Sequence, residues 1–443
     1  MNRYFRYLTG LSSIPFVRDV LTIQIGTSIY MAATFLASIV FARVLGVELY
    51  GIYAVTLAFV GTMNTFLNFG QGSSLLVFFA EQHGKKDRRG MATVLRNFLQ
   101  MSTINSCLML ILALLAPPLS TKLYGSPEIG SYARVLFLFA AIDIWNSMAL
   151  ILLQAMRRIR AKVLLEQGQN LSYLALAVLS LFFGYGIAGI VGTQLIVSAL
   201  FLPLTLGTLR WIGAYEGLPN LRGVLRVPFR ETIPYTLQGF LISVDKNIGN
   251  FFPQGLFFLM SLFTTPAIIG IARIAVQLST LPKTVLLPQV VDLSTTVLAA
   301  MRSKGLSVLR RNAARIIKHA FAFHLLMTAG AFVVLPILIP LVYGTQYNAA
   351  IPLTLWLLPL NLPNSLCVTN SPLLRLFRKI HYSIIQTLLT WIAMVMIILM
   401  GPMIAGVLPA FTIAYGLGQF MPVLLTIYIF TSLLRGKSGL HFA

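Results

Sequence analysis

Twelve apolar runs, each of about 20 residues, constrain the fold of this chain more than any motif does. A helix of about 20 apolar residues crosses the hydrocarbon core of a bilayer, and only helices and closed barrels satisfy their backbone groups there. The runs cover residues 20–42, 51–69, 98–118, 135–154, 163–183, 187–209, 240–262, 267–291, 320–341, 351–374, 384–400 and 407–433. The sequence therefore predicts an all-α, polytopic membrane protein with twelve transmembrane helices.

The composition excludes the soluble classes of protein. Hydrophobic residues make up 57% of the 443 residues, and charged residues make up 10%. A soluble protein has about 25% charged residues with which to cover its surface. These values exclude a cytosolic enzyme, a secreted disulfide scaffold and a disordered chain. The two cysteines, Cys107 and Cys367, lie inside apolar runs and show no metal-binding spacing and no evident disulfide pairing.

Basic residues gather in alternate loops, and this asymmetry predicts the orientation. The formal net charge is +22, from 33 Lys and Arg against 11 Asp and Glu. Of these 33 basic residues, 27 fall at the two termini or in every second loop, as in 85–96, 157–162 and 302–318. Basic loops remain on the cytoplasmic side. We therefore expect both termini to be cytoplasmic, in the cell (cytoplasmic or inner) membrane, and we expect the charge to attract anionic lipids rather than nucleic acid.

An internal repeat divides the sequence into two halves. Gly51 recurs as Gly270, and Tyr124 recurs as Tyr343, each within a matching dipeptide and each 219 residues later. Six spans per repeat is an even number, so both halves enter the membrane from the same side. Parallel repeats of this kind are related by an axis along the membrane normal. The sequence thus predicts two six-helix bundles around a central cleft.

The predicted domains follow from this division. They are a cytoplasmic or interfacial N-terminal segment (1–19), an N-terminal six-helix bundle (20–209), a cytoplasmic linker (210–238), a C-terminal six-helix bundle (239–433) and a cytoplasmic tail (434–443). The first segment has no small-residue cleavage site before a short apolar core, so we expect no removable signal peptide.

Charged and polar residues inside the apolar runs are the candidates for function. An ionised side chain at the bilayer centre costs about 2.5–3.5 kcal/mol or more, so it marks a candidate binding site. Arg273 and Gln277 share one face of the predicted eighth span, and Lys246 and Asn250 share one face of the seventh. The predicted substrate-binding residues are Arg273, Lys246, Arg43, Lys283, Gln277, Asn250, Asn64 and Asn68.

Each candidate also has a structural interpretation. The neutral residues can form hydrogen bonds between packed helices. Arg273 and Lys246 can form internal ion pairs with Asp245, Asp143 or Asp292, and Lys283 can extend toward the cytoplasmic edge. The acids Asp245, Asp143 and Glu166 are candidates either for binding a coupling ion or for salt bridges.

Motifs of soluble enzymes are absent from the sequence. It contains no P-loop, no HExxH, no CxxC and no nucleophile elbow. We therefore predict that the chain is not an enzyme and has no metal and no cofactor, with H⁺ or Na⁺ as candidate coupling ions.

One stretch resembles a known family. Arg43, Leu45 and Gly46 form an Arg-x-Leu-Gly turn, and Glu48 and Tyr50 follow it ahead of the Gly-Ile-Tyr-Ala sequence at 51–54. Residues 35–70 thereby resemble the N-terminal signature of polysaccharide transporters. These are oligosaccharide-lipid flippases of the O-antigen type, within the multidrug/oligosaccharidyl-lipid/polysaccharide exporter superfamily.

Two further stretches carry the resemblance into the second half. Residues 265–290 resemble the counterpart of the first signature, with Arg273 where that family often has a basic residue. Residues 341–359 resemble its loop between the ninth and tenth spans. The sequence departs from the family at Ala272, where an aromatic residue is common, and between Lys246 and Gly270.

The resemblance implies a function and partners. It implies translocation of a polyprenyl-diphosphate-linked oligosaccharide by alternating access, for surface polysaccharide biosynthesis. It also implies a polysaccharide polymerase and glycosyltransferases as partners alongside the membrane lipids.

Three alternatives remain at this point. A multidrug and toxin extrusion antiporter shares the superfamily architecture, but cationic drugs favour carboxylates in the cleft. A major-facilitator transporter also has twelve spans in parallel halves, but residues 84–90 (GKKDRRG) have the wrong spacing for its loop motif. A membrane-embedded glycosyltransferase or polymerase normally has a large extracytoplasmic loop, which this sequence lacks.

Overall fold

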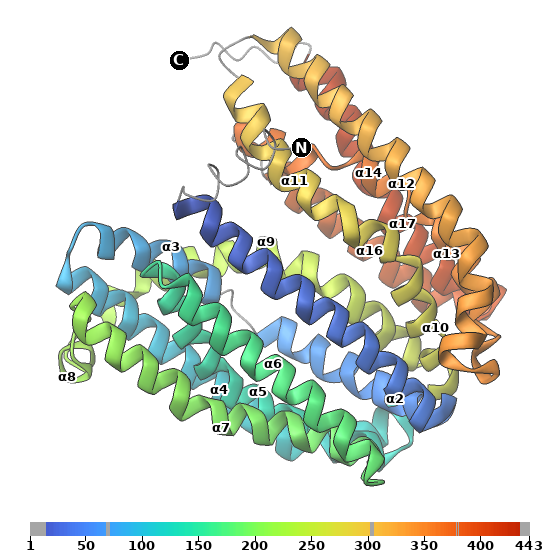
Figure 1. Ribbon diagram of the computed structural model, residues 1–443, viewed down its shortest axis with the longest axis horizontal. Coiled ribbons are helices and arrows are strands. Elements are labelled where there is room, and N and C mark those ends of the chain that lie inside the picture. Colours follow the sequence, from blue (N-terminus) through green and yellow to red (C-terminus); the bar gives the residue numbers. More distant parts are fainter. Residues whose placement is uncertain (1–14, 68–70, 302–304, 378, 380, 435–443) are drawn as a thin grey trace, which may run out of the picture. The chain divides into compact units, whose positions relative to one another are not determined.

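The structure is a computed structural model that describes residues 15–67, 71–301, 305–377, 379 and 381–434. Within these ranges it leaves undescribed the side chains of residues 15–21, 71, 73, 238, 240–253, 405 and ten positions between 285 and 300. All the secondary structure in the described ranges is helical (Figure 1). The predicted all-α class is confirmed.

The chain divides into two compact units. Unit 1 comprises the residues up to Leu45 and those from Phe59 to Asn247, and unit 2 comprises Gly46–Ala58 and the residues from Ile248 onward. Each unit has a hydrophobic core of its own, built in unit 1 around Leu75 and Phe79 and in unit 2 around Leu298 and Ile429. The division therefore assigns a segment of the first half of the sequence to the second unit.

Helix α2 (Pro15–Leu67) contains this segment. Its only non-helical residue is Gly46, with φ 73° and ψ 176°. Glycine populates a positive φ without the steric cost that a Cβ brings, so the Arg-x-Leu-Gly turn bends the helix here. Two predicted spans, 20–42 and 51–69, thus lie in one helical run that bends at Gly46.

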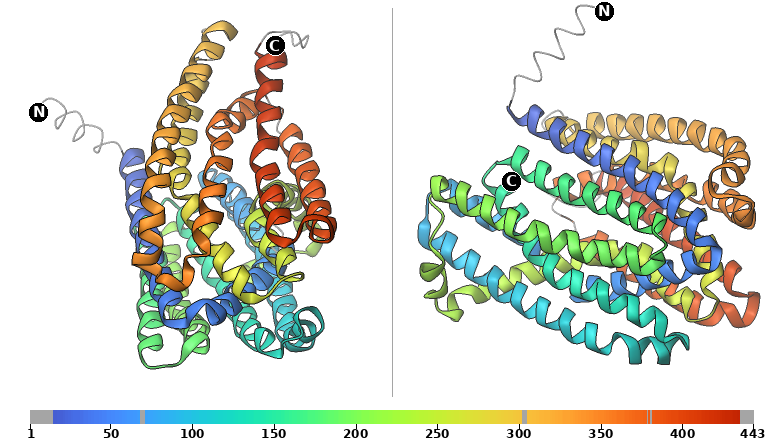
Figure 2. Two further views of the ribbon diagram at one scale, coloured as in Figure 1. Left: turned by 90° about the vertical axis from the view of Figure 1, so that its right-hand side faces the viewer. Right: turned by 60° about the horizontal axis from the view of Figure 1, so that its bottom comes forward.

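Unit 1 is built mainly from long helices that lie side by side (Figures 1 and 2). Besides the first part of α2 it contains α3 (Gln71–Gly84), α4 (Arg88–Tyr124), α5 (Pro127–Ala155), α6 (Ile159–Phe182), α7 (Gly186–Glu216), α8 (Leu221–Leu225) and the first part of α9 (Phe229–Ser261). Helix α4 shows how these elements begin and end. The Asp87 carboxylate accepts hydrogen bonds from the backbone N–H groups of Arg89 and Gly90, and Gly125 terminates the helix with φ 67°.

Unit 2 contains shorter helices as well as long ones. Besides Gly46–Ala58 and the end of α9 it contains α10 (Pro266–Ser279), α11 (Leu281–Met301), α12 (Leu306–Tyr343), the 3₁₀ helix η2 (Thr345–Tyr347), α13 (Ala350–Leu360), α14 (Pro363–Leu366), α15 (Asn370–Leu376), α16 (His381–Ala405), α17 (Val407–Tyr428) and the π-helical turn η3 (Ile429–Leu433).

Two predicted spans of unit 2 are discontinuous helices. The predicted span 267–291 consists of α10 and α11, which are separated at Thr280, and Pro282 follows directly. The predicted span 351–374 consists of α13, α14 and α15, with Pro359 and Pro363 at its first break. Proline removes a backbone donor and clashes with the preceding turn. Each of these two predicted spans is therefore divided into shorter helices, although residues 350–376 together are still long and apolar enough to cross a membrane.

Eight helical segments in the described residues are long and apolar enough to cross a membrane. They are Thr22–Leu67, Arg88–Tyr124, Pro127–Ala155, Gly186–Glu216, Leu306–Tyr343, Ala350–Leu376, His381–Ile404 and Val407–Leu433. The predicted number of twelve is not confirmed by the described residues, because α2 joins two predicted spans and none of the eight segments lies in α6, α9, α10 or α11; parts of α9 and α11 are outside the described residues.

The helix ends follow the repeat found in the sequence. Helix α4 ends at Tyr124 before Gly125 (φ 67°), and α12 ends at Tyr343 before Gly344 (φ 98°). The two helices therefore end at equivalent positions of the repeat, 219 residues apart, and a glycine with positive φ follows each.

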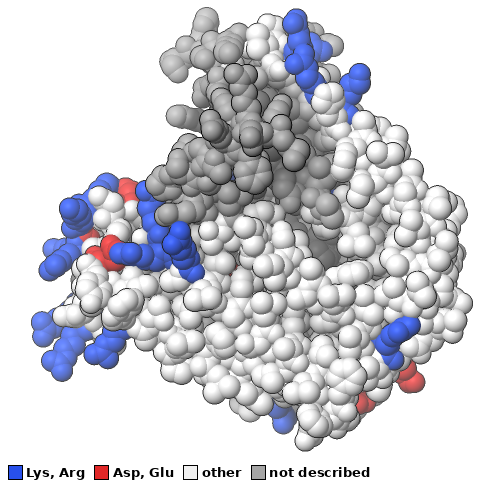
Figure 3. Space-filling view, in the orientation of Figure 1, with Lys and Arg blue, Asp and Glu red and all other residues white. Residues whose placement is uncertain are grey.

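Basic side chains gather at one end of unit 1. Figure 3 shows Lys and Arg concentrated there, near α3 and α8, beside a broad uncharged surface. Two ion-paired groups join the helix ends: Arg158 and His83 contact Glu216, and Arg89 contacts Glu231. We call this the basic end of unit 1. The loops 85–89 and 157–162 lie here, together with the starts of α4, α6 and α9.

Candidate substrate-binding and coupling sites

Arg273 lies on α10 among aromatic side chains of unit 2. Its guanidinium carbon is 6.0 Å from the centroid of the Phe257 ring. It also lies within hydrogen-bonding reach of the hydroxyl group of Tyr50, a side chain that is 2% exposed. In the described part of the chain Arg273 has no ion-pair partner, so aromatic faces and a phenol stabilise its charge where a carboxylate would be expected.

Tyrosines pack behind this contact. The Tyr50 ring lies edge-on to the Tyr347 ring at 6.3 Å, and Tyr347 lies edge-on to Tyr343 at 6.1 Å. Tyr343 and Tyr347 are completely buried. We call Arg273, Phe257, Tyr50, Tyr343 and Tyr347 the Arg273 cluster. Its rings hold the Arg273 side chain in place from one side.

A close helix crossing brings Tyr50 to Arg273. A Cβ atom on Gly51 would lie 2.0 Å from the carbonyl oxygen of Pro266, and one on Gly270 would lie 3.0 Å from the carbonyl oxygen of Val47. Only glycine permits such an approach of two backbones. The two glycines related by the sequence repeat therefore meet at this crossing.

A second polar group surrounds Lys283 at the two helix breaks of unit 2. The Lys283 ammonium donates to the Gln419 Oε1 atom over 3.4 Å, and the Asn364 Nδ2 atom donates to the same oxygen over 2.6 Å. Tyr415 donates to Asn361 Oδ1 over 2.8 Å, and Asn361 donates to the backbone carbonyl of Ser279 over 3.2 Å. We call Lys283, Gln419, Asn364, Asn361 and Tyr415 the Lys283 cluster. Broken helices expose backbone groups in the same way at the binding sites of secondary transporters.

His324 lies close to this cluster and is buried without a partner. Its side chain is 0% exposed, and neither ring nitrogen has a hydrogen-bond partner among the described residues. The Lys283 charge acts on it electrostatically, so the two groups are near neighbours. Thr328, one turn further along α12, also has an unpartnered hydroxyl. A buried polar group without a hydrogen bond costs about 1–3 kcal/mol.

Aromatic rings connect the two clusters of unit 2. Phe257, which contacts Arg273, lies 5.7 Å from the Phe411 ring, and Phe411 stacks on Tyr415 of the Lys283 cluster at 6.2 Å. Two basic groups of unit 2 are thus joined through side chains that are themselves packed.

Asp143 lies in a neutral polar cluster of unit 1. Its Oδ1 atom accepts hydrogen bonds from Gln169 Nε2 over 2.9 Å and from the Ser198 hydroxyl over 3.3 Å, and its Oδ2 atom accepts one from the Ser147 hydroxyl over 3.5 Å. The Asn146 side-chain amide donates a hydrogen bond to the Ser198 hydroxyl. No basic residue contacts Asp143 in the described part of the chain. Asp143 is therefore surrounded by neutral hydrogen-bond donors.

The other predicted residues fall into three groups. Glu166 forms an ion pair with Lys162 over 2.7 Å. This contact agrees with the second role considered for this acid, a salt bridge. Arg43 and Asn64 lie on the parts of α2 that belong to unit 1, and Gln277 lies one turn after Arg273 on α10. Asn68 and the side chains of Asp245, Lys246, Asn250 and Asp292 lie outside the described residues.

Several residues of these clusters were not predicted from the sequence. His324, Asn361, Asn364 and Gln419 were not among the candidates, because each is a single neutral polar residue in a long apolar run. One signal was present: Asn361 and Asn364 flank Pro363 inside an apolar run, and proline next to amides indicates a broken helix.

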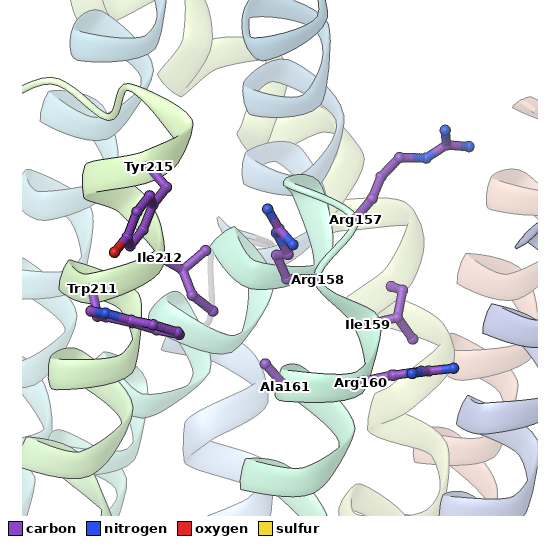
Figure 4. A pocket seen from close by; sticks show the side chains of 8 residues that line it. All are labelled: Arg157, Arg158, Ile159, Arg160, Ala161, Trp211, Ile212 and Tyr215. Carbon is purple, nitrogen blue, oxygen red and sulfur yellow. The ribbon is translucent and has the colours of Figure 1, made fainter.

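A pocket of about 590 Å³ lies at the basic end of unit 1, between the α5–α6 turn and the end of α7 (Figure 4). In Figure 4 Trp211 and Tyr215 form one side, Arg158 points between the helices, and Arg157 and Arg160 point away from the two aromatic rings. Trp211 and Tyr215 are 65% and 77% exposed. Exposed aromatics beside arginines are typical of the headgroup level of a bilayer. The lining of the pocket therefore has the composition that is typical of that level.

The fold is shared with solved transporters. One is the inward-facing conformation of a multidrug resistance MATE family transporter of the MOP superfamily, with 17% identity and a TM-score of 0.72 over 95% of this chain and 99% of that chain. Another is an outward-facing conformation of such a transporter, with 18% identity and a TM-score of 0.63 over 96% and 97%. A third is a MOP superfamily transporter from Pyrococcus furiosus Vc1, with 17% identity and a TM-score of 0.56 over 95% and 96%. Fold and apolar helices together define a multi-pass membrane protein with a MOP-superfamily transporter fold.

The sequence comparison identifies the family. The profile of the polysaccharide biosynthesis protein family matches residues 16–292, well over half of the chain. The chain belongs to this family, and the resemblance seen in residues 35–70 and 265–290 is confirmed. No curated protein sequence matches the chain as a significant relative.

Proposed function

We propose that this protein translocates an anionic, lipid-linked oligosaccharide across the cytoplasmic membrane for surface polysaccharide assembly, by alternating access. The headgroup is a polyprenyl diphosphate carrying an oligosaccharide repeat unit. Glycosyltransferases that build it and a polymerase that consumes it are the expected partners.

The observation that carries this proposal is the charge of unit 2. Arg273 and Lys283 lie on its apolar helices, and neither forms an ion pair in the described part of the chain. Unit 2 contains two acidic residues, Asp292 and the exposed Glu48, against a majority of basic residues. Positive groups without internal counter-charges favour a negatively charged passenger and disfavour a cation.

Arginine suits a diphosphate in particular. Its planar guanidinium presents paired donors to two phosphate oxygens, whereas lysine acts as a single point charge. The aromatic faces of the Arg273 cluster hold the guanidinium in place while leaving its remaining donors for a ligand. Within unit 2, Lys283 and the amides of Gln277 and Asn250 complete the proposed binding set, and Arg43, Lys246, Asn64 and Asn68 of unit 1 are proposed separately as substrate-binding residues.

A second candidate function is cation-coupled multidrug extrusion. It is supported by Asp143. This carboxylate accepts hydrogen bonds from neutral groups and has no positive partner in the described part of unit 1, so it favours a bound cation or proton. Two of the similar structures are multidrug resistance transporters, whereas the Pyrococcus furiosus transporter has a binding pocket of reverse polarity that suggests a different function for that protein. The sign of the charged groups at the binding site therefore discriminates between the two functions. In unit 2 these groups are basic, which favours an anionic substrate. In the proposed mechanism Asp143 binds the coupling H⁺ or Na⁺.

Substitution of Arg273 tests the proposal. In vesicles that contain the purified protein, Arg273→Ala should reduce translocation of the lipid-linked oligosaccharide at least about 100-fold, because both donors and charge are lost. Arg273→Lys should retain part of the rate, since the charge survives. The matched control is Arg134→Ala, which removes an exposed arginine of α5 in unit 1 and should leave the rate unchanged.

The structural interpretation of Arg273 predicts a different pattern. If the residue only supports packing, Arg273→Ala lowers expression and thermal stability, and its transport per folded molecule is normal. Normal transport by a well-folded Arg273→Ala protein contradicts the proposal.

A further inference from the structure

A groove of about 520 Å³ lies between α4 and the start of α9, within unit 1. Met101 and Ile104 line it from α4, and Phe229, Ile233 and Leu237 line it from α9. The three α9 residues recur every four positions, so they form one continuous face of the helix. The groove walls are therefore a pair of apolar helix faces.

These apolar side chains are open to the surroundings. Phe229 is 59% exposed, Ile233 is 48% exposed and Leu237 is 62% exposed, and on the opposite wall Ile104 is 47% exposed. The groove thus presents an open apolar surface on unit 1.

The polar groups at the floor of the groove are already satisfied. The Thr236 hydroxyl donates to Asn97 Oδ1 over 2.5 Å, and the Thr232 hydroxyl is 3.2 Å from Gln100 Oε1. These bonds hold α4 and α9 together and leave no demand for a polar ligand. The surface that remains for an occupant is apolar.

The groove begins at the basic end of unit 1. Arg89 at the start of α4 forms an ion pair with Glu231 at the start of α9 over 2.8 Å. Arg88 is next to Arg89 in the sequence, and Arg226 and Arg230 are close to the start of α9. All three are exposed, and none forms an ion pair among the described residues. Glu231 thus pairs with one of the arginines at the starts of α4 and α9, and Arg88 and Arg230 at the same helix starts leave positive charge for an anionic headgroup.

The depth of the groove matches one leaflet. It runs from Phe229, the first residue of α9, to Gly239, ten residues later. At about 1.5 Å per residue this is about 15 Å. The hydrocarbon core of a bilayer is about 30 Å thick, so the groove spans about half of it. An occupant therefore has its chain in one leaflet and its charge at the basic surface.

We propose that this groove between α4 and α9 docks the polyprenyl tail of the lipid-linked substrate, with its diphosphate against Arg88 and Arg230. The proposal rests on the proposed function for the identity of the lipid. Docking at this place presents the headgroup to the protein on the side of the membrane where the basic loops lie, and it keeps the tail in lipid throughout.

Photolabelling tests the docking site without any transport. The full chain, in phosphatidylcholine vesicles, is irradiated with a polyprenyl diphosphate that carries a diazirine on its tail, and labelled peptides are mapped by mass spectrometry. Label should concentrate in residues 97–104 and 229–237. Ile104→Trp and Ile233→Trp fill the groove and should each reduce labelling at least about fivefold. Leu114→Trp is the matched control, because Leu114 is a lipid-facing α4 residue, 73% exposed, outside the groove.

The salt dependence of labelling tests the proposed contact between the diphosphate and the two arginines. Arg88→Gln with Arg230→Gln should weaken labelling and make it less sensitive to salt, since the charge contribution is screened by ions. Excess phosphatidylglycerol should compete poorly. Equal competition by phosphatidylglycerol shows an unselective lipid groove and overturns the proposal, as does label that falls outside the groove.

The two proposals fail in distinguishable ways. Label outside the groove together with Arg273-dependent translocation contradicts the docking site and leaves the proposed function intact. Label in the groove with no translocation of any lipid-linked oligosaccharide contradicts the function and confirms a polyprenyl-phosphate site.

Discussion

Lys283 shows at the level of one residue how a charge inside an apolar helix indicates function. Its ammonium has one described acceptor, the Gln419 side chain at 3.4 Å, and no carboxylate. A charge in the bilayer core costs about 2.5–3.5 kcal/mol or more. Because Lys283 lowers stability and forms no ion pair in the described part of the chain, we infer that its charge serves to bind a ligand.

Lys283→Met should therefore separate stability from transport. Methionine has a similar length and removes the uncompensated charge, so the apparent melting temperature should stay the same or rise. Translocation should fall about tenfold or more. A thermal-shift assay in detergent and the vesicle assay measure the two effects. Lys318→Met, which replaces an exposed lysine on α12, is the control. A lower melting temperature with transport reduced in proportion would show that Lys283 is structural.

The charged residues were the part of the site that sequence could predict. Arg273 and Lys283 stand out because charge is rare in apolar runs, and each proves to be in a polar or aromatic cluster. The neutral members, His324 and Asn361 among them, could not be predicted, since a single Asn or His in an apolar run is compatible with any helix face. These residues meet only because particular helices of unit 2 pack together. The spacing of residues along one helix does not show which helices are neighbours.

The crossing of α2 and α10 is the clearest feature at the level of elements. Gly51 and Gly270 meet there, and backbone atoms fill the space around both. Side chains at either position would separate the helices and move Tyr50 away from Arg273. The crossing thus links the integrity of the fold to the geometry of the Arg273 cluster.

Gly51→Ala should be strongly destabilising. Its Cβ atom would lie 2.0 Å from the Pro266 carbonyl oxygen, and rigid backbone cannot yield as a side chain can. Overpacking of this kind costs about 1–3 kcal/mol, occasionally more. The matched control is Gly192→Ala in α7, where nothing lies within 4 Å of the new atom, and there stability should hold or improve. Denaturant titration in detergent compares them, and equal stabilities would contradict the crossing.

The helices themselves were largely predictable, and their breaks were not. Long apolar runs specify helices because the bilayer leaves few alternatives. The breaks at Thr280 and Asn361 follow from Pro282, Pro359 and Pro363, but proline also occurs inside the unbroken helices α4 and α7. Packing decides which prolines break a helix. The single run of α2 across two predicted spans has a similar origin, since Gly46 permits a bend without ending the helix.

The distribution of charge is the feature that concerns the whole molecule. In unit 1 the basic loops lie at one end, and Trp211 and Tyr215 lie beside their arginines. This arrangement agrees with the alternation of basic loops along the sequence. The orientation that it predicts is a cytoplasmic basic end.

Cysteine labelling in whole cells tests this orientation. Single cysteines placed in 85–89 or 157–160 should react with an impermeant maleimide only after the cells are opened. Cysteines at residues 184–186, in the turn between α6 and α7, should react in intact cells. The natural residues Cys107 and Cys367 are first replaced by serine. Labelling of 85–89 from outside would reverse the predicted topology.

Substrate polarity is the most direct test of the central claim. Vesicles that contain the purified protein are loaded either with a fluorescent polyprenyl-diphosphate-linked oligosaccharide or with a fluorescent cationic drug, and an impermeant quencher reports which of them crosses the membrane. We predict that the anionic lipid crosses in an Arg273-dependent manner while the cation stays in place. Arg273-independent movement of the cation, with the lipid-linked oligosaccharide unmoved, would contradict the proposed function.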